Sequence, residues 1–131
     1  MKIRTPDYVT LRLEKDTLDL SKEGNERASV RFELNGDALK VLLKANEGVR
    51  AITLRWKGKA REGVKILGDA WERGYGDLEW RGIVPDRHMP WYMAVSNGSD
   101  MVTDYSGRLT ECFGVGVQPG ALCMWKYDSE G

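Results

Sequence analysis

The stretch that decides the fold is Ala28-Ser-Val-Arg-Phe-Glu-Leu-Asn-Gly-Asp-Ala-Leu-Lys-Val-Leu-Leu-Lys-Ala45. Apolar residues occupy every second position from Ala28 to Leu34, which is the period of a strand that buries one face. Residues 39–45 fit the same pattern, and Asn35-Gly36 between the two runs is a strong hairpin signal. The stretch therefore predicts two antiparallel strands joined by a tight turn.

The rest of the chain carries further short runs of the same character. Strands are expected at 8–13, 51–56, 64–67, 91–96, 113–117 and 121–127. Turn signals separate them, and no stretch shows a helical period over more than about two turns. The sequence therefore predicts an all-β protein of about eight to ten strands, folded as an antiparallel β-sandwich. The alternation places these apolar side chains in its core: Val30, Phe32, Leu42, Leu54, Trp91 and Trp125.

The length of 131 residues suits a single domain over residues 1–131. The last predicted strand is followed by Asp128-Ser-Glu-Gly131, which has the composition of a turn that opens another hairpin arm. We therefore expect a fragment of a larger domain, incomplete at its C-terminal end. A natural polar terminus after a last strand is the alternative.

Charge and hydropathy limit the classes of partner. Lys and Arg together number 20, and Asp and Glu also number 20, so no positive excess attracts nucleic acid or an anionic membrane. No apolar run approaches the ~20 residues of a membrane helix. The N-terminal residues lack the apolar stretch of a secretory signal. We therefore expect a cytoplasmic protein with neither nucleic acid nor membrane as a partner.

Two cysteines, Cys112 and Cys123, each lie in a strand-like run among apolar neighbours. Buried free thiols are the expected state, and a disulfide or a metal site is the less favoured alternative. Together with the single histidine, His88, the cysteines cannot build a four-ligand zinc site without carboxylates. The sequence predicts no metal site and no cofactor.

Candidate ligand-binding side chains lie in the segment Leu67-Gly-Asp-Ala-Trp-Glu-Arg-Gly-Tyr-Gly-Asp-Leu-Glu-Trp80. Aromatic faces bind the apolar faces of sugar rings, carboxylates accept hydrogen bonds from sugar hydroxyls, and glycines allow close backbone approach. The mixture predicts a carbohydrate-binding surface, although an aromatic-rich corner of a sandwich has the same composition. Trp71 and Trp80 are the candidates for an exposed platform. The other tryptophans lie in strand patterns and are expected in the core: Trp56, Trp91 and Trp125.

The chain carries no recognisable catalytic motif. It lacks a G-x-S-x-G elbow, a Walker loop and an H-E-x-x-H helix. Asp77 and Glu79 lie two positions apart and would share one face of a strand, where they either contact a ligand or line a solvated edge. A retaining glycosidase needs two carboxylates on opposite sides of the scissile bond, about 5–5.5 Å apart. The sequence therefore predicts no catalytic residue, and we expect His88, in a loop, to be a surface or capping residue.

Four segments carry a resemblance to a known family. They are Gly68-Asp-Ala-Trp-Glu-Arg-Gly-Tyr-Gly-Asp-Leu-Glu-Trp80, Pro90-Trp-Tyr-Met93, Cys112-Phe-Gly-Val-Gly-Val117 and Ala121-Leu-Cys-Met-Trp125. In this order and spacing, they resemble the N-terminal β-domain of α-galactosidase-like proteins of glycoside hydrolase family 36. The resemblance implies a β-supersandwich followed by a (β/α)8 barrel that carries both catalytic aspartates. It also implies that this chain is a non-catalytic part of a retaining glycoside hydrolase.

The resemblance also implies residues that contact substrate. In that family the N-terminal domain lends an acidic loop to the galactose pocket, through a motif like Tyr-Gly-x-x-Asp-Phe-Arg. The segment Tyr75-Gly-Asp-Leu-Glu-Trp-Arg81 resembles it, with Glu79 at the acidic position and Trp80 at the aromatic one. Glutamate in place of aspartate adds one methylene group. The substrate-binding candidates are Trp71, Asp77, Glu79, Trp80 and Arg81.

The implied partners are an α-galactoside-like carbohydrate, bound through the parent enzyme, and the C-terminal barrel domain of the same protein. Homo-oligomerisation is left open by the sequence. Two other classes of protein fit the same residues. One is a free-standing carbohydrate-binding module that uses Trp71 and Trp80, and the other is a purely structural or oligomerisation domain.

Overall fold

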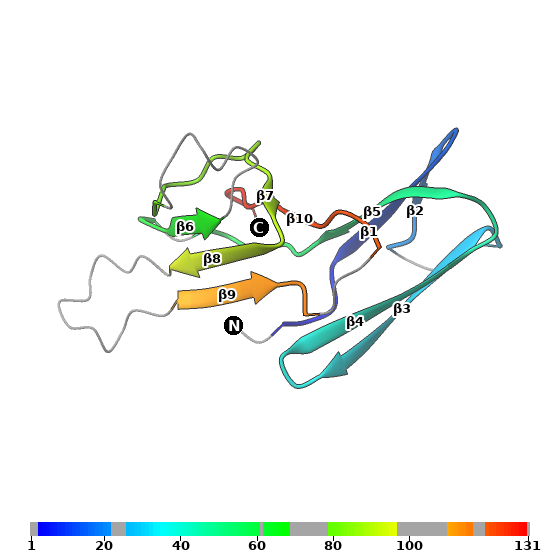
Figure 1. The fold of residues 1–131 in the computed structure, drawn as a ribbon, viewed down its shortest axis with the longest axis horizontal. Coiled ribbons are helices and arrows are strands. Elements are labelled where there is room, and N and C mark those ends of the chain that lie inside the picture. The colour runs from blue at the N-terminus through cyan, green and yellow to red at the C-terminus, as the bar shows by residue number, and fades with distance from the viewer. Residues whose placement is uncertain are drawn as a thin grey trace. The chain divides into compact units, whose positions relative to one another are not determined.

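The computed structural model describes residues 3–21, 26–60, 62–68, 79–96, 110–116 and 120–130. The chain divides into two compact units, unit 1 (Met1–Lys57) and unit 2 (Gly58–Gly131), and each is described by itself. Within the described residues there are ten strands and no helix (Figure 1). Every pair of strands is antiparallel. The all-β, antiparallel class predicted from the sequence is therefore confirmed, while the expectation of a single domain over 1–131 stays a prediction.

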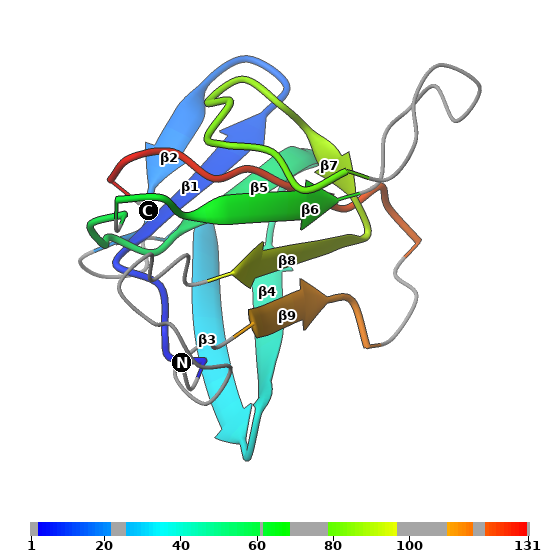
Figure 2. The same ribbon diagram turned by 90° about the vertical axis from the view of Figure 1, so that its left-hand side faces the viewer.

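Unit 1 contains two sheets. In the first, β1 (Tyr8–Leu13) lies between β2 (Thr17–Asp19) and β5 (Val49–Arg55). In the second, β3 (Ala28–Asn35) pairs with β4 (Ala38–Ala45), and the two run as a long ribbon in Figure 2. The short β2 was not predicted, because three residues are too few to show a period.

The predicted hairpin forms, and its turn fixes the register of both strands. Pairing runs from Ala28 opposite Ala45 to Asn35 opposite Ala38, which leaves Gly36 and Asp37 as a two-residue loop. Gly36 has φ of 60°. A positive φ at the first loop position is the requirement of a type II′ turn, and glycine meets it without steric cost.

The core of unit 1 lies between its two sheets. Its buried residues come from β1, from the segment after β2 and from the start of β3: Val9, Leu11, Leu13, Leu20 and Ala28. Partly buried side chains of β3 and β5 pack against them, including the predicted core residues Val30, Phe32 and Leu54. The period-two pattern of β1 therefore identified the buried face correctly.

The prediction that Leu42 is a core residue is wrong. Leu42 lies opposite Arg31, on the other face of the hairpin from Val30, and Leu43 takes the place opposite Val30. Leu42 shares its parity with Lys40 and Lys44, so the alternation over residues 39–45 itself places Leu42 on the face of the lysines and not on the face toward the core. The two-residue turn decides the register, because a slip of one residue would turn every side chain of β4 to the other face.

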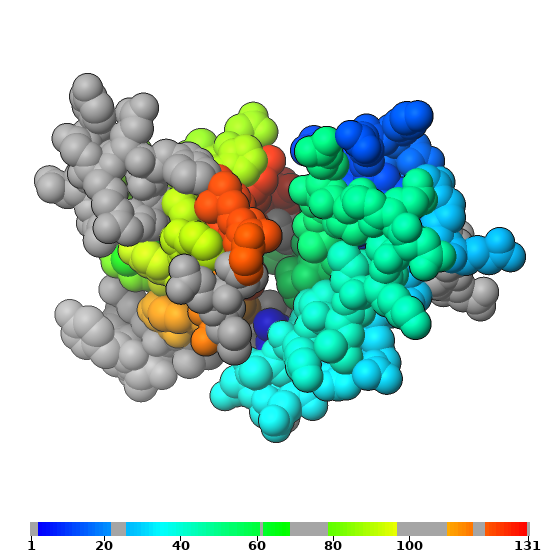
Figure 3. Space-filling model, turned by 45° about the vertical axis from the view of Figure 1, so that its right-hand side comes forward, coloured from blue at the N-terminus to red at the C-terminus, as the bar shows by residue number. Residues whose placement is uncertain are grey.

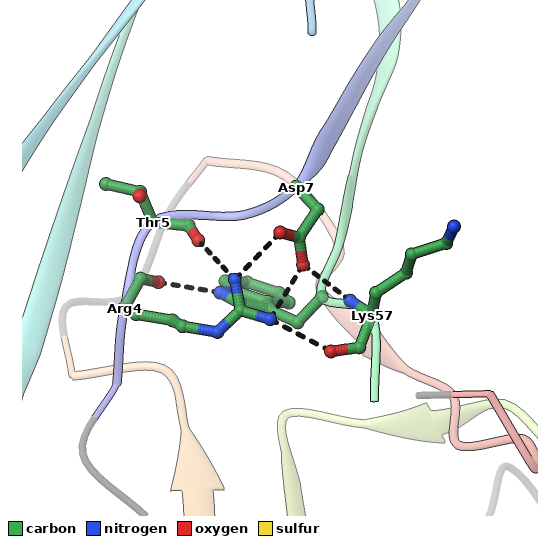
Figure 4. Close-up of polar contacts among 5 residues, drawn as sticks. Arg4, Thr5, Asp7 and Lys57 are labelled. Carbon is green, nitrogen blue, oxygen red and sulfur yellow. Dashed lines mark hydrogen bonds and ion pairs between the residues drawn. The ribbon is translucent and has the colours of Figure 1, made fainter. Parts of the chain in front are cut away.

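A polar cluster joins the start of the chain to the end of unit 1 (Figure 4). Arg4 donates from Nη1 and Nη2 to the two carboxylate oxygens of Asp7, at 2.9 and 2.7 Å, and from Nη2 to the Lys57 carbonyl at 2.9 Å. The Lys57 N–H donates to Asp7 Oδ2 at 2.7 Å. The hydrogen bonds from Arg4 and from the Lys57 backbone lower the pKa of Asp7 from 3.8 to about 2.

Trp56 belongs to the same cluster, and its expected place in the core is not borne out. It is half-buried and its indole Nε1 donates to the Arg4 carbonyl at 2.6 Å, whereas the residues packed on the buried cluster of unit 1 come from other positions. The polar edge of its ring explains this place, since an indole N–H needs an acceptor.

Unit 2 also contains two sheets. In the first, β8 (Tyr92–Ser96) lies between β6 (Lys65–Gly68) and β9 (Thr110–Gly114). In the second, β7 (Met89–Pro90) pairs with β10 (Met124–Trp125). The predicted strand at 113–117 begins earlier, and the one at 121–127 is reduced to two residues.

The buried cluster of unit 2 joins both of these sheets. Its members are Val64, Ile66, Met89, Met93 and Val95. The rings of Phe113 and Trp125 pack together on it, with centroids 5.8 Å apart. Trp125 is therefore confirmed as a side chain of the core, although it is only half-buried.

Trp91 does not occupy the predicted core strand. It is half-buried at a bend between β7 and β8, with φ of 68°, a conformation that costs a bulky residue steric strain. The Trp91 backbone is hydrogen-bonded to three other residues. Its N–H donates to the Cys123 carbonyl at 3.1 Å, and its carbonyl accepts from the Val115 N–H and from Trp125 Nε1, both at 3.2 Å. These hydrogen bonds hold the bend.

Both cysteines are free thiols, as expected, but they are not both buried. Cys112 is exposed, because Phe113 beside it on β9 faces the core and neighbouring residues of a strand face opposite ways. Cys123 is half-buried, and desolvation raises the pKa of its thiol. Along the described segments, no helix has the length and apolar character needed to cross a membrane.

Candidate functional site

The candidate residues Glu79, Trp80 and Arg81 lie along the outer edge of β6. The Ile66 N–H donates to the Arg81 carbonyl at 2.7 Å, and the Arg81 N–H donates to the Ile66 carbonyl at 2.9 Å. This single antiparallel bridge lies on the side of β6 away from β8. Because Ile66 is buried in the core of unit 2, the bridge fixes the backbone of the three residues to a well-packed strand.

All three side chains are exposed. Trp80 is 45% exposed as a residue, and the side chains of Glu79 and Arg81 are 61% and 51% exposed. Glu79 Oε2 lies 3.6 Å from Arg81 Nη2. Glu79 and Arg81 therefore form an exposed ion pair, Trp80 lies between them in sequence, and all three side chains are open to solvent.

The chain on the C-terminal side of the site is anchored again two residues later. Ile83 is partly buried and packs against the buried cluster of unit 2. Arg87 Nη2 donates to the carbonyl of Gly68, the last residue of β6, at 2.9 Å. The exposed residues 79–81 are thus attached to unit 2 at their C-terminal end, by the bridge from Arg81 to Ile66 and by the packed side chain of Ile83.

The hydrogen bond from Arg87 to the end of β6 is a contact that the sequence did not reveal. Arg87 is separated from Gly68 by 19 positions, and no local pattern in the chain connects the two. The nearby His88 is exposed, in agreement with its expected place on the surface.

Three of the five predicted site residues are described, and two of these form an ion pair. Glu79 and Arg81 lie together, and Trp80 is exposed between them. Trp71 and Asp77 lie outside the described residues, as does the predicted shared face of Asp77 and Glu79. In the described segments, no three His, Cys, Asp or Glu side chains converge as metal ligands.

The three described side chains carry the following groups for contact with a ligand. An indole face offers apolar contact area at its ring and a hydrogen-bond donor at Nε1. A carboxylate accepts hydrogen bonds, and a guanidinium group donates several in one plane. Hydroxyl groups of a ligand would suit the carboxylate and the guanidinium group, and an apolar ring face would suit the indole.

Three comparisons, with models of protein families, with curated proteins and with solved structures, gave no significant match to this chain.

Proposed function

We propose that this chain is a non-catalytic N-terminal domain of an α-galactosidase-like retaining glycoside hydrolase. It would pack on a following (β/α)8 barrel and lend residues 79–81 to the sugar pocket. The observation that carries the proposal is the exposed Trp80, flanked by Glu79 and Arg81 on a backbone fixed to β6. The family resemblance of Tyr75–Arg81 supports the same three residues. A cytoplasmic location belongs to the same proposal.

Each side chain has a distinct part in the proposed contact. Trp80 would stack on the apolar face of the sugar ring, and Glu79 would accept hydrogen bonds from adjacent hydroxyls. Arg81 would donate to a further hydroxyl. The ion pair is solvent-exposed and contributes at most about 1 kcal/mol, so the carboxylate can exchange Arg81 for a sugar hydroxyl at little cost.

Steady-state kinetics of the full-length enzyme that carries this domain test the proposal. Glu79→Gln should lower kcat/KM for an α-galactoside by about 10- to 100-fold, because a hydrogen bond to a charged acceptor is lost. The melting temperature should stay nearly unchanged, since the side chain is exposed. Glu14→Gln is the matched control, because Glu14 is also exposed and paired with an arginine, Arg50, at 3.0 Å.

Normal kinetics together with a large loss of stability in Glu79→Gln would make the segment a structural corner. A gene that encodes no barrel after this domain would also contradict the proposal.

A free-standing carbohydrate-binding module is the second candidate, favoured by the exposure of Trp80 in the chain by itself. Calorimetric titration of the 131-residue chain with α-galactosides separates the two candidates. Saturable heat that is abolished by Trp80→Ala supports the module. A domain that only completes the pocket of a barrel gives no such heat without its barrel.

A further inference from the structure

The outer edge of β3 has no partner among the described strands at Val30, Phe32 and Leu34. In the described part of the chain, β3 pairs with β4 alone. The tight turn makes Asn35 and Ala38 a hydrogen-bonded pair, and such pairs alternate along an antiparallel ladder. The alternation continues beyond the hairpin, where the Asn46 N–H donates to the Arg27 carbonyl at 3.0 Å.

This alternation determines which residues of β3 direct their backbone N–H and C=O groups toward the open edge. Ser29, Arg31 and Glu33 have the same parity as Asn35, so their N–H and C=O groups point toward β4. Val30, Phe32 and Leu34 have the opposite parity, so their N–H and C=O groups point outward. Open strand edges of this kind are templates for pairing with another strand.

The edge of β3 is complementary to itself. If a second copy of β3 lies antiparallel with Phe32 opposite Phe32, then Val30 of each copy lies opposite Leu34 of the other. Arg31 of each copy then lies opposite Glu33 of the other, on the solvent face. The outward backbone groups of Val30, Phe32 and Leu34 all find partners, and both charged residues meet the opposite charge.

The neighbouring registers of two β3 strands do not place Arg31 opposite Glu33. A shift of two residues, which keeps the outward groups facing each other, places either Arg31 opposite Arg31 or Glu33 opposite Glu33. Like charges directly opposite each other destabilise a strand pair. The charge pattern thus favours one register, centred on Phe32.

The edge of β4 lacks such self-complementarity. Its solvent face carries Lys40 and Lys44 and no acidic residue, so two copies of β4 offer each other no opposite charge. Lysines on an edge strand also oppose association with other strands. Of the two edges of the hairpin, only that of β3 suits a second copy of this chain.

We propose that the protein forms a symmetric dimer through the edge of β3. Two hairpins would join into a four-stranded antiparallel sheet with a twofold axis at Phe32, in the mode of strand addition. Atoms of the hairpin are seen in cyan in Figure 3. The Arg31 side chain is 74% exposed and 3.2 Å from Glu33 of its own strand, so it can pair with the Glu33 of a second copy without leaving a buried site.

The proposal also accounts for Leu34, which is 52% exposed on the apolar face of the hairpin. In the dimer it would lie against Val30 of the second copy, on the same face as the Phe32 pair. A single strand edge buries less surface than a permanent dimer interface. The dimer is therefore weak, and it forms in a concentration-dependent way. This inference stands independently of the proposed sugar contact.

Sedimentation velocity of the full chain over a range of concentrations tests the proposal. It compares the wild type with variants in which the charges at positions 31 and 33 are reversed. The wild-type chain should show a monomer–dimer equilibrium. Arg31→Glu and Glu33→Arg should each raise the dissociation constant by about tenfold or more, since two attractive pairs per dimer become repulsive. The double variant with both changes should restore the dimer, because the opposite charges again face each other.

A pair of proline variants tests the backbone contact on the same hairpin. Leu34→Pro removes an outward N–H of β3 and should abolish the dimer, whereas the hairpin keeps its own hydrogen bonds. Leu43→Pro removes the corresponding outward N–H of β4 and should leave the dimer intact. A monomeric wild type at all concentrations, or a dimer that the double exchange does not restore, would overturn the proposal. Folding of each variant is checked by circular dichroism.

Discussion

Gly68→Ala tests the close packing of the strand that supports the candidate site. Gly68 ends β6 and lies against Met89 of β7, which is buried. A Cβ atom at position 68 would lie 2.6 Å from Cγ and 2.8 Å from Cβ of Met89. The Cβ atom of Met89 moves only with its backbone, in a close-packed core. We therefore expect the free energy of unfolding to fall by about 1–3 kcal/mol, the usual cost of overpacking.

Chemical denaturation followed by tryptophan fluorescence measures this effect, because every tryptophan except Trp56 belongs to unit 2. Gly82→Ala is the matched control, since nothing lies within 4 Å of the Cβ it would add. Its stability should stay within about 0.5 kcal/mol of the wild type. Adding Met89→Ala to Gly68→Ala should cost less than the sum of the two single changes, because the pair is in contact. Equal stability of the two glycine variants would refute the close approach of β6 to β7.

Three further predictions concern the core, the polar cluster and catalysis. Leu11→Ala should lower the free energy of unfolding by about 2–5 kcal/mol in urea denaturation, because Leu11 is fully buried; a loss under about 1 kcal/mol would place it outside the core. The pKa of Asp7 is lowered from 3.8 to about 2 on folding, so its stabilising effect is present above pH 3.8 and is lost as the pH falls toward 2. Asp7→Asn should flatten this part of the curve of stability against pH, and an unchanged curve would speak against the cluster with Arg4. The 131-residue chain by itself should not hydrolyse an aryl α-galactoside; turnover that disappears in Asp77→Asn or Glu79→Gln would contradict a non-catalytic domain.

The local parts of the fold were predictable from the sequence because they depend on short-range rules. The alternation in β1 and β3 and the glycine in the turn at Gly36 determine those strands with little help from the rest of the chain. In β4 the lysines at 40 and 44 mark the solvent face, so the same alternation rule assigns Leu42 to that face, against the prediction of a core residue. The two-residue β7 is too short to carry a period, so its pairing with β10 depends on contacts that no local pattern encodes.

In the candidate site, too, the sequence predicted the local features and did not predict the long-range contacts. The exposure of Glu79 and Trp80 follows from local composition, since the carboxylates around the indole are costly to bury. The bridge from Arg81 to Ile66 and the hydrogen bond from Arg87 to Gly68 join distant positions. Such contacts depend on how β6 packs in unit 2, and the sequence offered no sign of them.

In the full-length enzyme that carries this domain, the proposed contact between Trp80 and a sugar ring is tested most directly by the NMR signal of its indole N–H during titration with an α-galactoside. The signal, assigned with Trp80→Phe, should shift in a saturable way. It should not shift with mannitol, which has hydroxyl groups but no ring face. The indole signal of Trp125, bonded to the Trp91 carbonyl at 3.2 Å, should stay in place as an internal control. A Trp80 signal that does not move with the galactoside, or that moves equally with mannitol, would contradict the account.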